Sequence, residues 1–319
     1  MRGAGQPIWD DIASAEQLDA LSPPRREHLP ERPDVLVVGG GVVGLAVAAF
    51  CSDAGMEVLL VEREQRLASC SSGRAAGGLG PDCHPELGPR WREAAHRSLE
   101  LHRELNNEMP YGLRTVDVSV LPDLVIPDQG HVDPLRFCAA LASRTLTIAT
   151  GCAYEELSDV RAAHTVFATG AAPDDARIDG QSFVKGHLVA TVPVEPLFDG
   201  MIGTGRSDIL VLQLPSGHVI AGGTKEPSIE APDIDEDVVR YVADEMVRAV
   251  PALEDVPISH RWTCFRPLIP DALPIAKRIR EDVWCVAGLY STGILMAPLI
   301  GYAIATAIDR GADAEPLFD

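Results

Sequence analysis

The residues best suited to chemistry lie near the start of the chain, in a turn with the sequence GGGVVG. Gly39, Gly41 and Gly44 follow the G-x-G-x-x-G spacing, after an apolar run and before a helix-like segment. Gly39 permits a tight turn, Gly41 lets the backbone approach a pyrophosphate, and Gly44 lets the helix lie close to the strand. Glu62 ends the next apolar run, where it would accept hydrogen bonds from a ribose hydroxyl. The pattern predicts a dinucleotide site, and a glycine-rich turn without ligand is the alternative.

Two buried strands and the helix between them must position this turn. Residues 34–38 and 57–61 are short apolar runs, typical of parallel strands that are covered on both faces, so the segment predicts a βαβ unit. Residues 184–223 contain short β runs with the turn signal PSG at 215–217, which predicts an antiparallel sheet. Residues 86–108 and 234–250 have the apolar periodicity of amphipathic helices.

Composition limits the partners of the chain. It has 319 residues and a net charge of -20, which disfavours nucleic acid and anionic membrane surfaces. Its seven cysteines are odd in number and form no CxxC pair, so we expect free thiols, a cytoplasmic location and no metal site. No signal-peptide pattern is present at the N-terminus.

Residues 1–33 are polar and rich in proline, so we expect an N-terminal arm with a short helix near 14–21.

Six further motifs follow in order along the chain. They are SSGRAAGGLG (71–80), DQGHVDPLRFCAALA (128–142), VFATGA (166–171), KGHLVAT (185–191), FRPLIPDALPI (265–275) and GLYSTGILMAP (288–298). Together, over roughly residues 34–310, they resemble the D-amino-acid oxidase family of FAD enzymes, in particular its glycine oxidase and sarcosine oxidase branch. Six matches in the family's order are far more specific than any one of them.

The resemblance implies an α/β fold of the glutathione-reductase type, with a Rossmann-like FAD-binding domain and a second, antiparallel-sheet substrate domain. The FAD-binding domain would comprise residues 34–110, 131–177 and 270–319. The substrate domain would comprise residues 111–130 and 178–269. The stretch 145–166 is shorter than in most relatives, so we expect the small hairpin over the adenine to be trimmed.

The resemblance also implies FAD as the cofactor. In the second motif, small residues would bring backbone N–H groups close to the isoalloxazine, and Arg74 would contact the flavin phosphates or hold the loop. An ordinary flexible loop is the alternative. The residues predicted to bind the cofactor are Gly39, Gly41, Val42, Val43, Gly44, Glu62, Arg63, Ser72, Gly73, Arg74, Ala75, Ala76, Gly77, Gly78, Leu79, Ala168, Thr169, Gly170, Gly288, Ser291, Thr292, Gly293 and Ile294.

The uncharged stretch 288–308 is long enough to cross a bilayer. The resemblance instead implies a core helix whose N-terminus points at the flavin pyrimidine ring, where its dipole would stabilise negative charge. Ser291 and Thr292 are candidate caps of that helix. Pro298 and the lack of flanking anchors also argue against a membrane span.

For function, the resemblance implies oxidation of an amine or an amino-acid-derived substrate to an imine, with O2 as acceptor and H2O2 as product. Arg266 matches the family arginine that binds a carboxylate through its guanidinium fork. A salt bridge from Arg266 to Asp271 or another acid is the alternative. Tyr290 is the other candidate catalytic residue. Residues 289–293 read LYSTG where glycine oxidases have H-Y-R-N-G, so one cation is missing and simple glycine oxidation is not implied.

Two other functions remain open at this point. One is a dehydrogenase that passes electrons to a partner subunit or a quinone, and the other is a non-catalytic flavin-binding subunit. For every one of these functions, a homo-oligomer and an assembly with a partner subunit both stay open. Cys70, Cys83 and His84 flank the flavin loop but match no covalent attachment motif. We expect the histidines of the 86–108 helix, His96 and His102, to be solvated.

Overall fold

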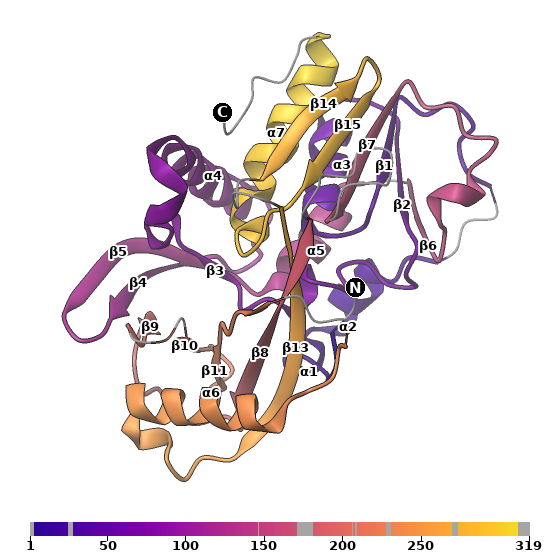
Figure 1. The fold of residues 1–319 in the computed structure, drawn as a ribbon. Helices are drawn as coiled ribbons and strands as arrows, with labels where there is room; N and C mark the ends of the chain where they lie inside the picture. Colours follow the sequence, from indigo (N-terminus) through magenta and orange to yellow (C-terminus); the bar gives the residue numbers. More distant parts are fainter. Residues whose placement is uncertain are drawn as a thin grey trace.

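The chain folds around two β-sheets, one in the upper part and one in the lower part of Figure 1. The structure is a computed structural model that describes residues 3–24, 28–145, 147–170, 181–205, 207, 209–227, 231–269 and 274–311. The first sheet has six strands in the order β14-β15-β7-β1-β2-β6. The second has nine, in the order β12-β8-β11-β10-β9-β4-β5-β3, with β13 pairing with β8. These two sheets confirm the predicted α/β architecture.

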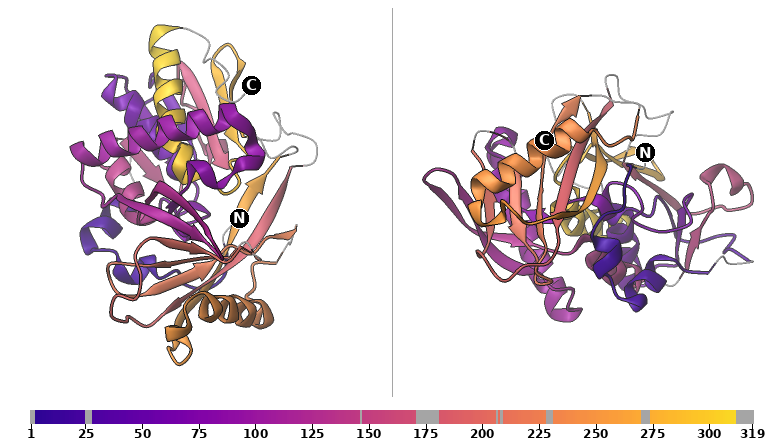
Figure 2. Two further views of the ribbon diagram at one scale, coloured as in Figure 1. Left: turned by 90° about the vertical axis from the view of Figure 1, so that its left-hand side faces the viewer. Right: turned by 90° about the horizontal axis from the view of Figure 1, so that it is seen from below.

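The first sheet contains the predicted βαβ unit. Strands β1, β2, β6, β7 and β15 are parallel, and β14 pairs with β15 in the antiparallel sense. Helices α3, α4, α5 and α7 pack around this sheet (Figures 1 and 2). The element bounds are β1 (Val35–Val38), α3 (Val42–Asp53), β2 (Val58–Glu62), α4 (Gly88–Glu108), α5 (Pro134–Ala142), β6 (Thr147–Thr150), β7 (His164–Gly170), β14 (Ile275–Arg280), β15 (Val283–Ala287) and α7 (Gly293–Arg310).

The second sheet is mainly antiparallel, as expected, although β4 and β9 form a parallel pair. Helix α6 (Glu236–Ala249) covers one face of it, because its apolar stripe packs on β8, β10 and β11. The division of the chain into domains at the residues given above stays a prediction. The strands are β3 (Gly78–Leu79), β4 (Arg114–Val120), β5 (Leu124–His131), β8 (Ser182–Thr191), β9 (Met201–Gly203), β10 (Leu210–Gln213), β11 (Val219–Gly222), β12 (Glu226–Pro227) and β13 (Ile258–Leu268).

The connection between β6 and β7 is short. Residues 151–163 form one 3-10 turn, Tyr154–Glu156, and no strand. A hairpin is therefore missing from this connection, in line with the shortened stretch in the sequence.

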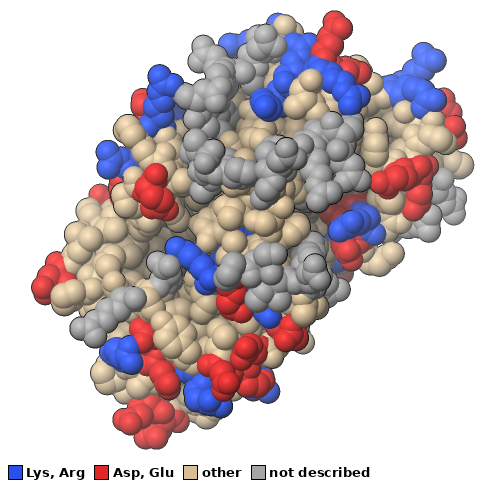
Figure 3. Space-filling model, in the orientation of Figure 1, with Lys and Arg blue, Asp and Glu red and all other residues tan. Residues whose placement is uncertain are grey.

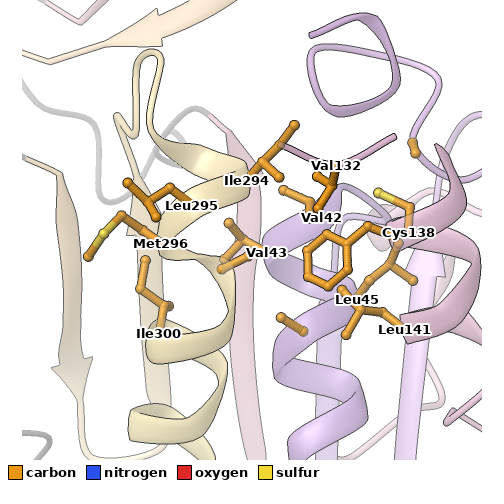
Figure 4. Packing of buried hydrophobic residues seen from close by; sticks show 14 of the residues in the cluster. Val42, Val43, Leu45, Val132, Cys138, Leu141, Ile294, Leu295, Met296 and Ile300 are labelled. Carbon is orange, nitrogen blue, oxygen red and sulfur yellow. The ribbon is translucent and has the colours of Figure 1, made fainter. Parts of the chain in front are cut away.

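Helix α7 is apolar because it crosses the core between α3 and α4. Figure 4 shows Val43 of α3 pointing toward the first turns of α7, near Leu295 and Met296. An added Cβ at Gly301 would lie 2.8 Å from the backbone of Ala46, so glycine allows the two helices to approach closely. Within the described residues, α7 alone is long and apolar enough to cross a membrane, and 56% of its 18-residue window is buried inside the protein.

Two side chains of α4 bind backbone groups of α7 near Pro298, where the helix has lost a hydrogen bond. Proline has no N–H, so the carbonyl of Ile294 loses its helical donor. His102 Nε2 lies 3.0 Å from that oxygen and donates to it. One residue further on, the Ser98 hydroxyl donates to the Leu295 carbonyl at 2.6 Å and accepts from the Leu299 N–H at 3.2 Å. The expectation that His102 is solvated is therefore wrong, because it is fully buried against α7.

The N-terminal arm folds into two short helices, α1 (Trp9–Ile12) and α2 (Ala15–Leu21). The predicted helix near 14–21 is confirmed. Ser14 and Gln17 form a reciprocal capping box that fixes where α2 begins. Trp9 and Leu21 are fully buried in the main core, so the arm is an integral part of the packing.

We expect His102→Leu to lower the free energy of unfolding by about 1–3 kcal/mol, because it leaves the Ile294 carbonyl buried without a donor. His96→Leu is the matched control. His96 lies on the same helix, its side chain is 49% exposed, and within the described part of the chain it pairs with Asp82 across 3.0 Å. Its loss should change the free energy of unfolding by less than about 0.5 kcal/mol. Urea unfolding of the two variants measures the difference, and equal values would contradict the repair of α7 by His102.

Candidate active site

The dinucleotide turn is built by close backbone contacts at the carboxyl end of β1. Gly39 has a φ of 114°, and an added Cβ would lie 2.5 Å from the carbonyl oxygen of Ala168 on β7. At Gly44 an added Cβ would lie 1.9 Å from the Gly39 oxygen. Both positions therefore require glycine, as the motif predicts. The turn and the end of β7 come together, which brings Ala168, Thr169 and Gly170 to the same edge of the sheet.

Gly41 differs from its neighbours because space is open beside it. It is the N-cap of α3, with an ordinary φ of -76°, and only the Ser72 hydroxyl, at 3.3 Å, lies within 4 Å of an added Cβ. The Val42 N–H donates to the same hydroxyl at 3.0 Å. The backbone of Gly41, at the positive end of α3, is thus partly exposed. This cradle fits the pyrophosphate of a dinucleotide.

Glu62 is held in place at the end of β2. One carboxylate oxygen accepts the Gly40 N–H at 2.6 Å, and the other accepts the Glu64 N–H at 2.9 Å. Each oxygen keeps a further lone pair with which it can accept a ribose hydroxyl. Its neighbour Arg63 points outward. That side chain is 70% exposed and lies 3.9 Å from Glu64, so its predicted cofactor contact has no support from this geometry.

The flavin loop, residues 71–80, has four successive backbone carbonyls that accept hydrogen bonds from other segments. The donors are an indole N–H, a second indole N–H, an imidazole N–H and a backbone N–H. In order, Trp262 Nε1 binds the Arg74 oxygen (2.9 Å), Trp9 Nε1 the Ala75 oxygen (2.8 Å), His131 Nε2 the Ala76 oxygen (3.1 Å) and Val132 N the Gly77 oxygen (3.0 Å). In a trans peptide the N–H points opposite to the C=O, so the N–H groups of residues 75–78 are directed to the other side of the loop. The loop is therefore an ordered element with oriented donors.

Glycines allow this loop to lie against its support. An added Cβ at Gly73 would lie 2.2 Å from the Ala68 oxygen. At Gly77, where φ is 86°, it would lie 2.0 Å from the Val132 oxygen.

Arg74 has a different role from the predicted phosphate contact. Its side chain is buried, and Nε donates to the Thr263 carbonyl at 2.7 Å. One terminal nitrogen donates to the carbonyls of Ala4 and Gly5, the latter at 2.7 Å. The guanidinium thus joins the loop to β13 and to the N-terminal arm. Of the two predicted roles, the structure supports holding the loop.

The start of α7 leaves its backbone donors open. Thr292 is the N-cap, but its hydroxyl donates back to the Leu289 carbonyl at 2.8 Å and makes no cap hydrogen bond. The expectation that Thr292 caps the helix is wrong for this reason, and Ser291 is exposed. Gly288, whose N–H lies 3.3 Å from the Gly170 oxygen, brings this turn beside the end of β7. The uncapped N–H groups can bind an electron-rich carbonyl.

Arg266 and Tyr290, the two predicted catalytic residues, lie together. The guanidinium carbon of Arg266 is 5.9 Å from the centroid of the Tyr290 ring. Gly186 makes room for it, since an added Cβ there would lie 2.7 Å from Arg266 Nη1. Tyr290 has a φ of 46°, and its N–H donates to the Pro267 carbonyl at 3.0 Å. A tyrosine held in this strained conformation is typical of a functional site.

With this geometry in view, comparisons with known proteins are decisive. The family model described as "FAD dependent oxidoreductase" (DAO) matches residues 34–123 and 110–307. The chain belongs to this family. The resemblance inferred from the motifs is thus confirmed, with FAD as the cofactor.

Individual proteins resemble this chain at low sequence identity. The bifunctional protein ThiO/ThiG of Nostoc sp. strain PCC 7120 is 24% identical over 346 residues, covering 86% of this chain and 52% of that protein. The chain thus spans about half the length of this relative. The crystal structure of glycine oxidase from Geobacillus kaustophilus has a TM-score of 0.75 at 21% identity, covering 90% of this chain and 96% of that one. L-proline dehydrogenase from P. horikoshii has a TM-score of 0.77 at 19% identity, covering 89% and 95%. Both structures share the fold.

The sequence analysis did not predict the network of polar groups that is hydrogen-bonded to Arg266. Arg266 Nη1 donates to the Thr224 carbonyl at 2.8 Å, and the Thr224 hydroxyl donates to Glu226 at 2.9 Å. The fully buried His187 accepts the Asp235 N–H through Nε2, so its Nδ1 carries a proton and donates to Glu226 at 2.7 Å. Burial alone would raise the pKa of the Glu226 carboxyl, but the hydrogen bonds from His187 and Thr224 lower it below its ordinary value.

The signal for this network was in the sequence. The KGHLVAT strand places Lys185 and His187 at alternate positions of an otherwise apolar run, and buried polar side chains need partners. Asp271, the predicted alternative partner of Arg266, lies outside the described residues.

Cys83, beside the flavin loop, does not have the features of a reactive thiol. Burial and the neighbouring Asp82 carboxylate raise the pKa of the Cys83 thiol to about 11, so it is protonated at neutral pH. The described residues contain no group of three or more potential metal ligands.

The cradle at Gly41 leads to a first test of the cofactor site. We expect Gly41→Val to keep the fold, since only the movable Ser72 side chain lies near, but to lose FAD because the added atoms occupy the pyrophosphate position. Gly44→Ala should instead destabilise the protein itself, because its Cβ meets backbone. FAD content and circular dichroism of each purified variant distinguish the two effects. A folded Gly41→Val protein with full FAD would place the pyrophosphate elsewhere.

A second test uses the buried histidines. Burial lowers the pKa of His102 and of His131 to about 4, against an ordinary value of 6.5. Between these values the unfolded chain binds more protons than the folded protein, so the free energy of unfolding should fall as pH drops from 6.5 to 4. His131→Gln keeps an N–H donor for the Ala76 carbonyl but cannot titrate. Urea unfolding from pH 7.5 to 4.5 should therefore show a shallower loss for this variant. An unchanged slope would contradict the assignment.

Proposed function

We propose that this flavoenzyme oxidises an amine or amino-acid-derived substrate that carries a carboxylate. The observation that supports it best is the placement of Arg266 beside Tyr290. Bound FAD supplies the hydride acceptor, N5 of its isoalloxazine, and the product is an imine. A subunit that only binds flavin would have no need for a partly buried arginine next to a strained tyrosine.

Arg266 would bind the substrate carboxylate. Nη1 is committed to the Thr224 carbonyl, which fixes the plane of the guanidinium, and no carboxylate of the described residues forms an ion pair with it. The remaining N–H groups can bind a carboxylate in a bidentate way. Tyr290 would flank the same substrate with its ring and limit its orientations. The substrate nitrogen must be unprotonated to release a hydride from the neighbouring carbon.

The missing cation narrows the range of substrates that the site could bind. Where glycine oxidases have arginine, this chain has Ser291, and its side chain is exposed. A single arginine therefore binds the acid group, and the second position is open to a larger substituent. We favour a secondary amine or a substituted amino acid over glycine.

We further propose O2 as the electron acceptor, with H2O2 as product. One structure with this fold is named an oxidase (glycine oxidase) and another a dehydrogenase (L-proline dehydrogenase). The fold therefore does not identify the electron acceptor, which needs a direct test. Substrate is added anaerobically to bleach the flavin, and then air is admitted. Rapid return of the colour with stoichiometric H2O2 supports the oxidase, whereas slow return that only a quinone or another electron acceptor accelerates would favour the dehydrogenase.

The proposal extends to location and partners. We propose that the protein is a cytoplasmic enzyme with a small-molecule substrate. It would act as a homo-oligomer or together with a partner subunit. The net charge of -20 argues against nucleic acid and anionic membranes as partners. Acidic side chains are spread over the face shown in Figure 3 around α6.

Arg266→Lys tests the substrate class. The variant keeps the charge but loses the bidentate fork, so we expect kcat/KM for a carboxylate-bearing amine to fall by the equivalent of about 1.5–3 kcal/mol. FAD content should not change. Arg261→Lys is the control on the same strand, because Arg261 is exposed and pairs with Glu236 at the surface across 3.1 Å.

An amine panel scored by flavin bleaching supplies the substrate for these measurements. If Arg266→Lys and Arg261→Lys retain equal efficiency on a carboxylate-bearing amine, Arg266 is not the carboxylate-binding residue. If no amine bleaches the flavin, the proposed reaction is wrong.

A further inference from the structure

Part of the N-terminal arm, residues 3–24, contacts the flavin loop directly, and its role is not explained by the dinucleotide site. We propose that the arm is a brace that orients the flavin loop, with Trp9 as the positioning residue. The proposal rests on the binding of FAD and goes beyond the proposed reaction. It predicts that cofactor retention and loop order depend on a segment outside both sheets.

Trp9 is placed to hold one peptide unit of the loop. It is fully buried, and its Nε1–H donates to the Ala75 carbonyl at 2.8 Å. Its ring centroid lies 6.3 Å from that of His131, which holds the next carbonyl, that of Ala76. The two rings thus form a support behind two successive peptides. Because each peptide is planar, fixing the carbonyls also fixes the N–H groups of Ala76 and Gly77.

The start of the arm is anchored on the second sheet. The Thr263 N–H donates to the Ala4 carbonyl at 3.0 Å, and the Ala4 N–H lies 2.8 Å from the Thr263 hydroxyl. Gly3 lies so close to this strand that an added Cβ would be 1.9 Å from the Thr263 oxygen. Arg74 of the flavin loop donates to Thr263 and to Gly5 at the same place. Arm, loop and β13 therefore share one set of hydrogen bonds.

The rest of the arm is anchored beside the first sheet. Asp10 forms an ion pair with Arg66 across 2.8 Å, and the Leu67 N–H donates to the Leu21 carbonyl at 2.9 Å. Residues 66 and 67 follow β2 and lead into the flavin loop. With anchors on both sides, the arm can hold Trp9 at a defined depth. A segment that only filled space would need no such polar attachments.

The chain offers a matched pair of tryptophans for the test. Trp9→Phe keeps most of the ring but removes the donor to Ala75. Trp284→Phe is the control, because Trp284 is also buried and its Nε1 has no hydrogen-bond partner among the described residues. Both variants lose one indole N–H and a similar volume. Only the first loses a hydrogen bond to the flavin loop.

The measurements are made on the FAD-loaded protein and need no substrate. Hydrogen–deuterium exchange of the peptide covering residues 75–78 should become about tenfold faster in Trp9→Phe, the effect of losing one buried hydrogen bond. FAD should be released about tenfold faster, as followed by its fluorescence. Trp284→Phe should stay within about twofold of the parent protein in both measurements, since no bond to the loop is lost.

Equal exchange and equal FAD release in the two variants would overturn the proposal. If Trp9→Phe does not fold, Asp10→Asn provides the second test, because it weakens the anchor to Arg66 and leaves the indole intact. It should accelerate exchange of the same peptide, and no change would also overturn the brace. These outcomes are independent of amine oxidation. Failure of the brace leaves the proposed reaction intact, and an amine panel without bleaching leaves the brace testable.

Discussion

Buried backbone groups that cannot be satisfied locally govern the structure of this flavoenzyme. The flavin loop has four successive carbonyls, those of residues 74–77, that accept hydrogen bonds from segments outside the loop. Two indoles, an imidazole and a backbone N–H supply the donors. The same requirement recurs at Pro298, where His102 and Ser98 satisfy α7. An unsatisfied buried carbonyl costs about 1–3 kcal/mol, so these side chains determine which backbone conformation is stable.

This constraint links parts of the chain that are far apart in sequence. Arg74 is the clearest case, because its buried guanidinium is surrounded by carbonyls of the arm and of β13. A buried cation is tolerated only when its N–H groups are bound. Its position therefore couples the flavin loop to the second sheet. Movement of either sheet relative to the other would therefore displace the flavin loop.

The surroundings of Arg266, where we propose that the substrate binds, contain the same kind of hydrogen bond with a different result. Around Arg266 the backbone carbonyl of Thr224 leaves the guanidinium partly free, and the network of Glu226 and His187 holds that carbonyl in place. Arg74 donates to carbonyls of two segments and holds the structure together, whereas Arg266 is the residue that we propose binds the substrate carboxylate. Two arginines that both lie in family motifs thus differ in their contacts because of what surrounds them.

The sequence alone predicted the features that depend on local spacing. Gly39, Gly41, Gly44 and Glu62 belong to one βαβ unit, whose geometry follows from the periodicity of strand, turn and helix. The antiparallel second sheet and the burial of α7 were also predicted, since each depends on an apolar pattern or on an ordered set of motifs.

Only the tertiary structure showed which polar side chains serve the site. Arg74 lies in a flavin motif but binds Thr263, 189 positions later. Trp9 lies in a segment with no recognisable pattern and contacts Ala75, 66 positions later. His102 has the helical spacing of the buried residues Ser98 and Leu105, but its partner, the Ile294 carbonyl of α7, lies 192 positions later. A hydrogen bond is short-ranged and directional, so its partner is decided by where distant segments pack. No local pattern in the sequence records that placement.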